Sequence, residues 1–417
     1  MGEEIVMPDF EFFRADKKMP TTHCSFLLGA GFSVNQGYPT ANDLNSQIKN
    51  INPDNFTIDG EGNLFNLPEA KDDPFWYFSD ARKKYFIKEV IQFYLGENKE
   101  FDYEEFYDFL MNSSLLKRDE FKAICKQFRD KYNIKTEEKD IEFGNRELIS
   151  KSIKLMNQII QIMLVDKDGK NFYEPSVHQM KPLPSEYTGF LQLLEKVGED
   201  SVVHVHSLNH DILFETFNHS DWINGGLSDG FEELGSKFYG RIEDNKMIRL
   251  NHFTNRYDHR FNLYKLHGSL DQFPFRHQDG SDTEYIKIKN RVSTSNLYKE
   301  VKDREGNYNY ENDFTNYYPD FLSGTTHKIT RYKEGYYKEV FEHFVNNLKR
   351  SDRLIIVGYG CKDSKINELI LENFDFESKK AVIIDPFPSD DVKSFGEKIN
   401  AMIIQKKPHQ AMMEVLE

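Results

Sequence analysis

The chain has 417 residues and a formal net charge of −15, and 38% of its residues are hydrophobic. This length exceeds one ordinary domain but suits one domain that carries a large insertion, with enough apolar residues for a sizeable core. Because so acidic a chain is a poor general binder of nucleic acid, we expect no direct nucleic-acid binding by this chain alone.

Cysteine usage and hydropathy favour a cytoplasmic protein. The three cysteines, Cys24, Cys125 and Cys361, are far apart and form no C-x-x-C pair, which argues against a disulfide framework and a zinc ribbon. The acidic start of the chain lacks the apolar region of a signal peptide, and no run approaches the roughly 18 apolar residues of a membrane helix. We therefore expect a cytoplasmic protein that makes no membrane contact.

The chain begins with a charged arm, residues 1–20, that carries an aromatic cluster at Phe10, Phe12 and Phe13. We expect these rings to pack on the main domain or on a neighbouring subunit. An apolar run, Phe26–Leu28, then marks the first buried strand.

This first strand stops at a glycine turn, Gly29-Ala30-Gly31, which leads to Ser33. After a short loop, residues 40–48 read as a helix. A buried strand, a glycine turn and a helix form the phosphate-cradling arrangement of a dinucleotide site, because glycines let a pyrophosphate approach the backbone closely. Taken alone, the motif is more often a tight turn at the end of a buried strand.

Helical periodicity dominates residues 74–167. Apolar residues recur at helical spacing between Phe86 and Tyr94, and residues 104–110, 121–128 and 149–164 repeat the pattern. We expect a helical insertion between the first and second sheet-forming segments, with its apolar stripes in the core.

Strands and helices alternate in the rest of the chain. Strands are expected at 201–206, 263–266, 284–289, 353–357, 381–384 and 401–404, and helices at 186–197, 212–217, 336–348, 363–373 and 393–399. Asp363 is expected to be the N-cap of the helix 363–373. Residues 225–261 read as loops and hairpins, and residues 308–318 look the least structured. This rhythm predicts an α/β fold, a Rossmann-like parallel sheet flanked by helices, over residues 21–404, with 405–417 as a C-terminal tail.

Glycines or polar residues cluster at four of the predicted strand ends, residues 29–33, 207–211, 265–269 and 358–363. Open α/β sheets bind ligands at the carboxyl ends of their strands. The four motifs, G-A-G-x-S, S-L-N-H-D, H-G and a late glycine turn, occur in the order found in the sirtuin family. The chain thus resembles the NAD-consuming sirtuins from about Cys24 to Ile404.

The sequence departs from that family at several places. Ser207 stands where the family has threonine, and the acidic and arginine residues that follow the first motif are missing after Pro39. Three scattered cysteines also cannot build the four-cysteine zinc ribbon of sirtuin deacetylases. The chain looks instead like the bacterial sirtuin-like NAD hydrolases of anti-phage defence, closest to the stand-alone subunit paired with a HerA-type ATPase. Residues 321–325, with Lys328, also resemble that branch.

The resemblance implies roles for individual residues, with NAD+ as substrate and no metal. Nine residues would bind the nucleotide: Gly29, Ala30, Gly31, Ser33, Ser207, Asp211, Gly358, Tyr359 and Asp385. The first four of these would cradle the pyrophosphate, and the last three would line the adenosine half. Asn209 would hold the nicotinamide ribose or the attacking water, and Asp211 would support that loop. His267 would contact the ribose hydroxyls as base or orienter.

Each of these residues also has a purely structural interpretation. A buried histidine at a strand end is usually a satisfied core residue, and Asn209 and Asp211 are placed to cap a helix. Asp385 precedes a proline and could simply end a strand. The trio His204, His206 and His210 invites a metal reading, but no convergent cysteine or carboxylate set accompanies it.

Three functions fit the pattern. The first is an NAD+ glycohydrolase that depletes NAD+ in abortive anti-phage defence. The second is an NAD-dependent protein deacylase or ADP-ribosyltransferase, and the third is a non-catalytic sensor of NAD or ADP-ribose. Because the first activity is toxic, we expect control by homo-oligomerisation or by a partner such as a HerA-type ATPase.

Overall fold

The structure is a computed structural model of the whole chain. It describes residues 21–58, 64–66, 79–98, 100–134, 140–165, 169, 187–223, 226–242, 246–275, 283–289, 292, 297–312, 319, 321, 335–410 and 415. The aromatic arm 1–20, residues 313–318, residues 322–328, and residues 411–414 and 416–417 of the C-terminal tail lie outside the described residues.

A parallel sheet of seven strands forms the centre of the molecule, in the order β17-β16-β15-β1-β4-β10-β5. The strands are β1 (Thr22–Leu28), β4 (Ser201–Ser207), β5 (Leu227–Ser228), β10 (Phe261–Lys265), β15 (Arg353–Val357), β16 (Lys380–Ile384) and β17 (Met402–Ile404). Every neighbouring pair runs parallel. The α/β fold class expected from the sequence is therefore confirmed.

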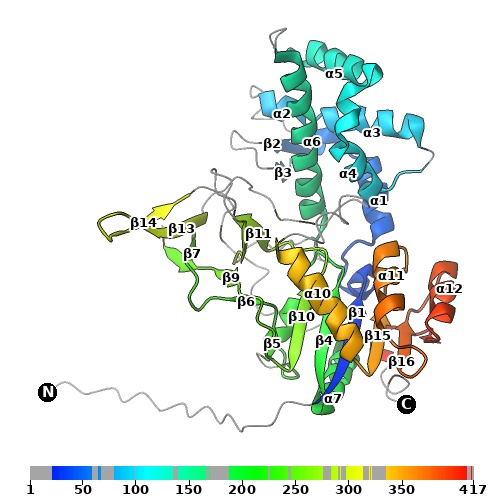
Figure 1. Cartoon of the computed structure of the whole chain (residues 1–417). Coiled ribbons are helices and arrows are strands. Elements are labelled where there is room, and N and C mark those ends of the chain that lie inside the picture. The colour runs from blue at the N-terminus through cyan, green and yellow to red at the C-terminus, as the bar shows by residue number, and fades with distance from the viewer. Residues whose placement is uncertain are drawn as a thin grey trace.

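Helices cover both faces of the sheet, which is why its central strands are buried on both sides. One face packs on α7 (Thr188–Asp200), and the other packs on α10 (Gly335–Arg350), α11 (Ser364–Asn373) and α12 (Asp390–Lys398). On β1, Phe26 and Leu28 enter the α7 core, while Leu27 enters the α10 core. Figure 1 shows α10 crossing the front of the sheet.

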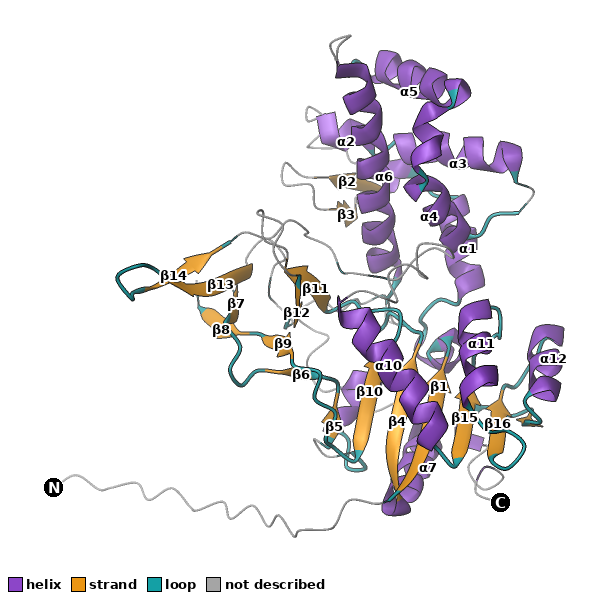
Figure 2. Ribbon diagram, in the orientation of Figure 1, coloured by secondary structure: helices purple, strands orange, loops and turns teal. Residues whose placement is uncertain are grey.

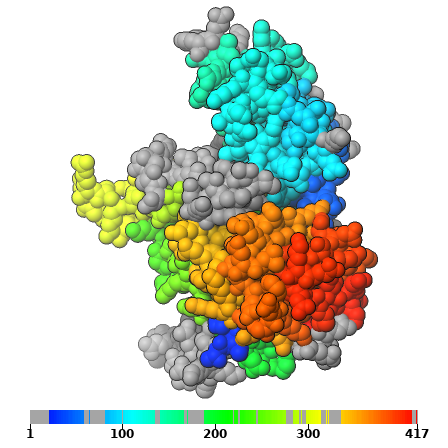
Figure 3. Space-filling view, turned by 45° about the vertical axis from the view of Figure 1, so that its right-hand side comes forward, coloured from blue at the N-terminus to red at the C-terminus, as the bar shows by residue number. Residues whose placement is uncertain are grey.

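The carboxyl ends of the strands point toward a helical subdomain, as the arrowheads in Figure 2 show. Its helices are α1 (Ala41–Lys49), α2 (Ser79–Lys83), α3 (Phe86–Glu97), α4 (Tyr103–Met111), α5 (Asp119–Tyr132) and α6 (Ile141–Met163). Helices α2 to α6 lie where the periodicity predicted them. The subdomain core also takes in Leu44 and Ile48 from α1, and the short hairpin β2 (Phe56–Ile58) and β3 (Leu64–Asn66) packs beside it. In the space-filling view the helical subdomain lies above the C-terminal strands and helices (Figure 3).

Two small antiparallel sheets lie beyond the side of the central sheet that ends in β10 and β5 (Figure 2). The first contains β6 (Phe231–Glu232), β9 (Asn251–Phe253), β11 (Gln272–Phe275) and β12 (Glu284–Lys287), and the second contains β7 (Phe238–Arg241), β8 (Met247–Arg249), β13 (Leu297–Lys302) and β14 (Tyr308–Glu311). No helix among the described residues is long and apolar enough to cross a membrane.

One expectation from the sequence was wrong. Residues 308–311 looked unstructured, but they form β14, which pairs with β13 as a hairpin. The turn is stabilised by Asp303, whose carboxylate accepts hydrogen bonds from the backbone of Glu305 and Asn307. Tyr310 then packs edge-on against Tyr239 on β7. All four residues of β14 are solvent-exposed, so this strand lacks the apolar alternation by which strands are recognised.

Candidate functional site

The turns that follow β1 and β15 touch each other through glycines. Gly29 N–H donates to the Val357 carbonyl at 3.0 Å, and Gly31 N–H donates to the Gly358 carbonyl at 2.9 Å. A Cβ atom on Gly29 would lie 2.6 Å from the Gly358 oxygen, and one on Gly31 would lie 2.9 Å from the Gly358 Cα. Gly358 itself has a φ of 62°. Contact between the two turns is therefore sufficient to require glycine at these positions.

The residues after the glycine turn are anchored in the core. Phe32 is buried among the rings of α7 and α8 (Leu213–Thr216), and its backbone carbonyl accepts a hydrogen bond of 2.7 Å from the Tyr187 hydroxyl. Ser33 is buried at 1% exposure, whereas Ala30 is partly exposed and Gly31 is exposed. The turn is thus accessible at Ala30 and Gly31 and anchored in the core at Phe32 and Ser33.

Asn209 joins the β4 end to the β1 turn. Its side-chain Nδ2 donates to the Gly29 carbonyl and to Ser33 Oγ, each at 3.0 Å, and its backbone N–H donates to Ser207 Oγ at 3.2 Å. Both amide protons of the side chain are thereby engaged within the protein. The side-chain oxygen Oδ1 is then the atom of Asn209 with the capacity to accept a further hydrogen bond.

Asp211 holds the same loop in place. Its Oδ1 accepts a hydrogen bond of 2.9 Å from the backbone of Leu213, at the start of α8, and the residue is buried. The Asp211 backbone carbonyl accepts a hydrogen bond from the ammonium group of Lys265 at the end of β10. Local capping and a buried cation together fix the β4 loop against the β10 end.

His267 follows β10 and is buried at 5% exposure. Its Nε2 lies 3.5 Å from Oδ2 of Asp363, and its ring centroid lies 6.3 Å from that of His210. Asp363 belongs to the late glycine turn, and the sequence identified it only as a helix cap. A short acidic side chain directly after the glycine turn of β15 is the signal that would have placed it near the site.

The remaining predicted residues of that region mainly support the turns. The Tyr359 hydroxyl lies 3.1 Å from both the Asp363 carbonyl and Asn367 Oδ1, and its ring is buried in the α10 core. Asp385 Oδ1 accepts a hydrogen bond of 2.8 Å from the backbone of Phe387. Gly358 and Tyr359 therefore lie against the β1 turn, whereas Asp385 follows β16, on the far side of β15. The described bonds of the Tyr359 and Asp385 side chains are directed at the protein itself.

Residues 203–404 match the SIR2-like domain. The match begins in β4, ends with β17, and includes Asn209, His267 and Asp363. The β1 glycine turn and the helical subdomain lie outside it. A comparison with curated proteins gives no match.

Solved structures of Sir2 proteins overlap this chain loosely. A structure described as the basis for the mechanism and regulation of Sir2 enzymes has 11% sequence identity and a TM-score of 0.35, and the overlap covers 94% of this chain and 91% of that one. A Sir2 homologue in complex with NAD has 11% identity, a TM-score of 0.36, and coverage of 94% and 88%. A mutant Sir2 homologue with ADP-ribose has 11% identity, a TM-score of 0.35, and coverage of 94% and 90%. Overlaps this loose carry no weight for the function of the chain.

Buried charges gather around Lys265 and Lys287, near the His267 loop. Lys287 Nζ on β12 lies 2.7 Å from Asp229 and 3.6 Å from both Asp271 and Glu215, and Lys265 Nζ lies 3.6 Å from Glu215. Burial raises the pKa of Glu215, because the charged form loses its hydration. Burial opposes the charge of Lys287, but the three carboxylates raise its pKa well above the usual range. Periodicity in the sequence gave no sign of this cluster.

The histidines of β4 are neutral core residues. His204 Nδ1 lies 3.2 Å from the Tyr264 hydroxyl, and its Nε2 lies 3.0 Å from His23 Nδ1. Burial lowers the pKa of His204 to about 3 and that of His206 well below its ordinary value. Among the described residues, no three His, Cys, Asp or Glu side chains gather as a metal site. Burial raises the pKa of the Cys361 thiol to about 12, which leaves it un-ionised at neutral pH.

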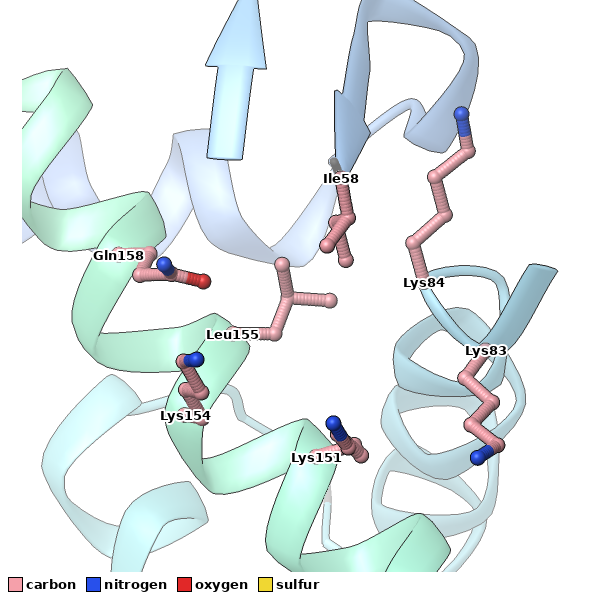
Figure 4. A pocket seen from close by; sticks show the side chains of 7 residues that line it. All are labelled: Ile58, Lys83, Lys84, Lys151, Lys154, Leu155 and Gln158. Carbon is pink, nitrogen blue, oxygen red and sulfur yellow. The ribbon is translucent and has the colours of Figure 1, made fainter. Parts of the chain in front are cut away.

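A separate cavity lies in the helical subdomain, lined by Ile58, Lys83, Lys84, Lys151, Lys154, Leu155 and Gln158 (Figure 4). Its volume of about 20 Å³ has room for about one water molecule. The ammonium groups of Lys83 and Lys84 point in opposite directions, and they contact Glu147 and the Phe56 carbonyl respectively. The lysines therefore do not converge on a common ligand.

Proposed function

We propose that this protein is an NAD+ glycohydrolase, which cleaves NAD+ to nicotinamide and ADP-ribose. The observation that carries the proposal is the placement of Asn209. Asn209 lies within the residues 203–404 that match the SIR2-like domain, and its side-chain amide donates to Gly29 and Ser33 in the turn after the adjacent strand β1. His267 follows the next strand of the same sheet. Ligands of open α/β sheets bind at such strand ends.

The chemistry requires few groups. As the bond from ribose C1′ to the nicotinamide nitrogen breaks, its electron pair goes to the nitrogen and positive charge builds on the ribose. Water forms the new bond to C1′ and releases a proton. Asn209 Oδ1 is suited to accept a hydrogen bond from that water or from a ribose hydroxyl, and His267 is suited to take up the proton.

A protein deacylase or ADP-ribosyltransferase is the second candidate. In sirtuins a four-cysteine zinc module helps to frame the acyl-peptide cleft, and this chain has three cysteines, all buried. A non-catalytic NAD or ADP-ribose sensor is the third. A site that only binds NAD or ADP-ribose, without cleaving it, would not need both the Asn209 and the His267 side chains.

The setting that we propose is NAD+ depletion in the cytoplasm during anti-phage defence. Control would come from homo-oligomerisation or from a partner such as a HerA-type ATPase. The resemblance of the motifs supports this setting. Native mass measurement of the chain, alone and with a co-expressed operon neighbour, tests it.

Incubation of the purified protein with NAD+ alone separates the three functions. We expect nicotinamide and ADP-ribose to form without any acceptor, and Asn209→Ala and His267→Ala each to lower the rate by at least about 100-fold. His252→Ala is a matched control, because His252 lies on β9 and bonds the Glu232 carbonyl. Turnover only with an acylated peptide would favour the deacylase, and full activity of either site variant would refute the assignment.

A further inference from the structure

The imidazole of His267 and the carboxylate of Asp363 form a buried pair across two strand ends. The distance of 3.5 Å separates Nε2 from Oδ2, and the side chains are only 7% and 18% exposed. This separation is longer than a strong charge-assisted hydrogen bond but well within ion-pair range. Catalytic hydrogen bonds are often long without substrate and shorten when substrate binds.

The carboxylate of Asp363 is rigidly oriented. Its Oδ1 accepts hydrogen bonds from the backbone N–H groups of Lys365 and Ile366, at 3.0 and 3.1 Å, and so caps α11. The helix N-terminus also favours the negative charge of the group. With Oδ1 committed to the cap, Oδ2 is the oxygen that faces His267.

The backbone around Asp363 is braced as well. The Tyr359 hydroxyl lies 3.1 Å from the Asp363 carbonyl, and Asn367 Nδ2 donates to the Cys361 carbonyl at 2.7 Å. On the other side of the pair, Leu266 N–H donates to the Ser207 carbonyl at 2.9 Å. Both partners thus stand on turns whose positions are set by the sheet.

Asp363 is the nearest charged group to His267 among those with a described contact. His210, in the loop after β4, is the other titratable ring near it, at 6.3 Å between centroids. Lys265 precedes His267 on β10, but its ammonium group bonds the Asp211 carbonyl and faces Glu215. A carboxylate at this distance stabilises the protonated form of an imidazole.

We propose that Asp363 is the positioning residue of His267. It orients the ring and stabilises the imidazolium that forms when His267 takes the proton from the attacking water. The catalytic part of this proposal rests on the proposed NAD+ cleavage, whereas the pairing itself does not.

The variant that isolates the charge is Asp363→Asn. Asparagine caps helices as well as aspartate does, so α11 keeps its cap while the negative charge is lost. If that variant does not fold, Asp363→Ser serves the same purpose, because serine is also a strong N-cap residue. Asp375→Asn is the matched control, since Asp375 is exposed, bonds Ser378 locally and lies beyond α11.

The first measurement is an NMR titration of ¹³C-labelled histidines, with the His267 signal assigned by its loss in His267→Gln. We expect the titration midpoint of His267 to move to lower pH by about one unit in Asp363→Asn, and to stay in place in Asp375→Asn. An unchanged midpoint in Asp363→Asn overturns the pairing, whatever the enzyme does with NAD+.

The second measurement is the pH profile of NAD+ cleavage. In Asp363→Asn we expect kcat to fall by about tenfold or more, the KM for NAD+ to stay within about twofold, and the acid limb of the profile to move to lower pH. A rise in the KM of Asp363→Asn with an unchanged kcat would refute a positioning role. A shifted NMR midpoint in a wild-type protein that does not cleave NAD+ would overturn the proposed function but leave the pair established.

Discussion

The side-chain amide of Asn209 donates to the backbone carbonyl of Gly29 at 3.0 Å, across 180 residues of chain. This bond joins the first and second strand-end motifs through a side chain rather than through the sheet alone. The backbone ladder brings β1 beside β4, and Asn209 then ties the turn of one to the loop of the other. The same residue therefore serves both the integrity of the site and the chemistry proposed for it.

Asn209→Asp tests the structural and the catalytic role of Asn209 with almost no change in side-chain volume. A carboxylate cannot donate to the Gly29 carbonyl, so two buried acceptors would face each other. We expect a destabilisation of about 1–3 kcal/mol together with loss of NAD+ cleavage. Urea unfolding and a nicotinamide-release assay measure the two effects. Unchanged stability would mean that the bond to Gly29 contributes little.

Gly358→Ala tests the contact between the two glycine turns. Gly358 has a φ of 62°, and an added Cβ would lie 2.4 Å from the backbone nitrogen of Phe32. We expect a loss of about 3 kcal/mol or more in the free energy of unfolding, since strain and a backbone clash combine. Gly360→Ala is the control, because a Cβ there meets nothing within 4 Å. Thermal melts of the two variants should differ by several degrees, and equal melting temperatures would contradict the packing argument.

His206→Phe should make the protein more stable in mild acid. The ring lies between Tyr264 and Phe344, and neither of its nitrogens has a hydrogen-bond partner among the described residues. Burial holds its pKa well below 6.5, so below that pH the unfolded chain binds a proton that the folded chain does not. Stability is thus complete above pH 6.5 and falls as the pH drops. At pH 5 the penalty removed by phenylalanine is about 2 kcal/mol.

Denaturant unfolding at pH 5 and pH 8 measures this effect. We expect the gain of His206→Phe over wild type to be larger at pH 5. His204→Phe is the comparison, because burial lowers the pKa of His204 to about 3 but its ring bonds His23 and Tyr264. That variant should show the same pH trend with lower stability at pH 8. If the free energies of unfolding of wild type and His206→Phe changed equally with pH, the pKa of this ring would be the same in the folded and the unfolded chain, which would contradict the prediction.

Lys265→Met tests the buried charge cluster. The substitution keeps most of the side-chain volume but leaves the Asp211 carbonyl without its cation and leaves Glu215 with Lys287 as its remaining described cation. Removing one partner of a buried pair costs about 3–5 kcal/mol. The double variant Lys265→Met with Glu215→Gln should recover part of that loss, as a double-mutant cycle in urea would show. Additive losses would indicate that the two side chains do not interact.

Local sequence determined much of the fold. The uninterrupted apolar runs at Phe26–Leu28 and Leu354–Val357 predicted buried parallel strands, and both formed. Asp363 was identified as the cap of α11 from its place before a helical segment, and its carboxylate makes that cap. Such features are decided within a few residues, because hydrogen bonds of caps and periodicity of burial are local.

Tertiary structure alone decided which of these elements meet. The sheet order places β1 between β15 and β4, with β10 beyond β4, and this order brings the turn of β15 against that of β1. No periodicity in the chain specifies that Asp363 will face His267, 96 positions earlier in sequence. The partners of Lys265 and Lys287 come likewise from segments far apart in the chain. A buried charge is stable only beside its counter-charge, and that neighbour exists only once the sheet has assembled.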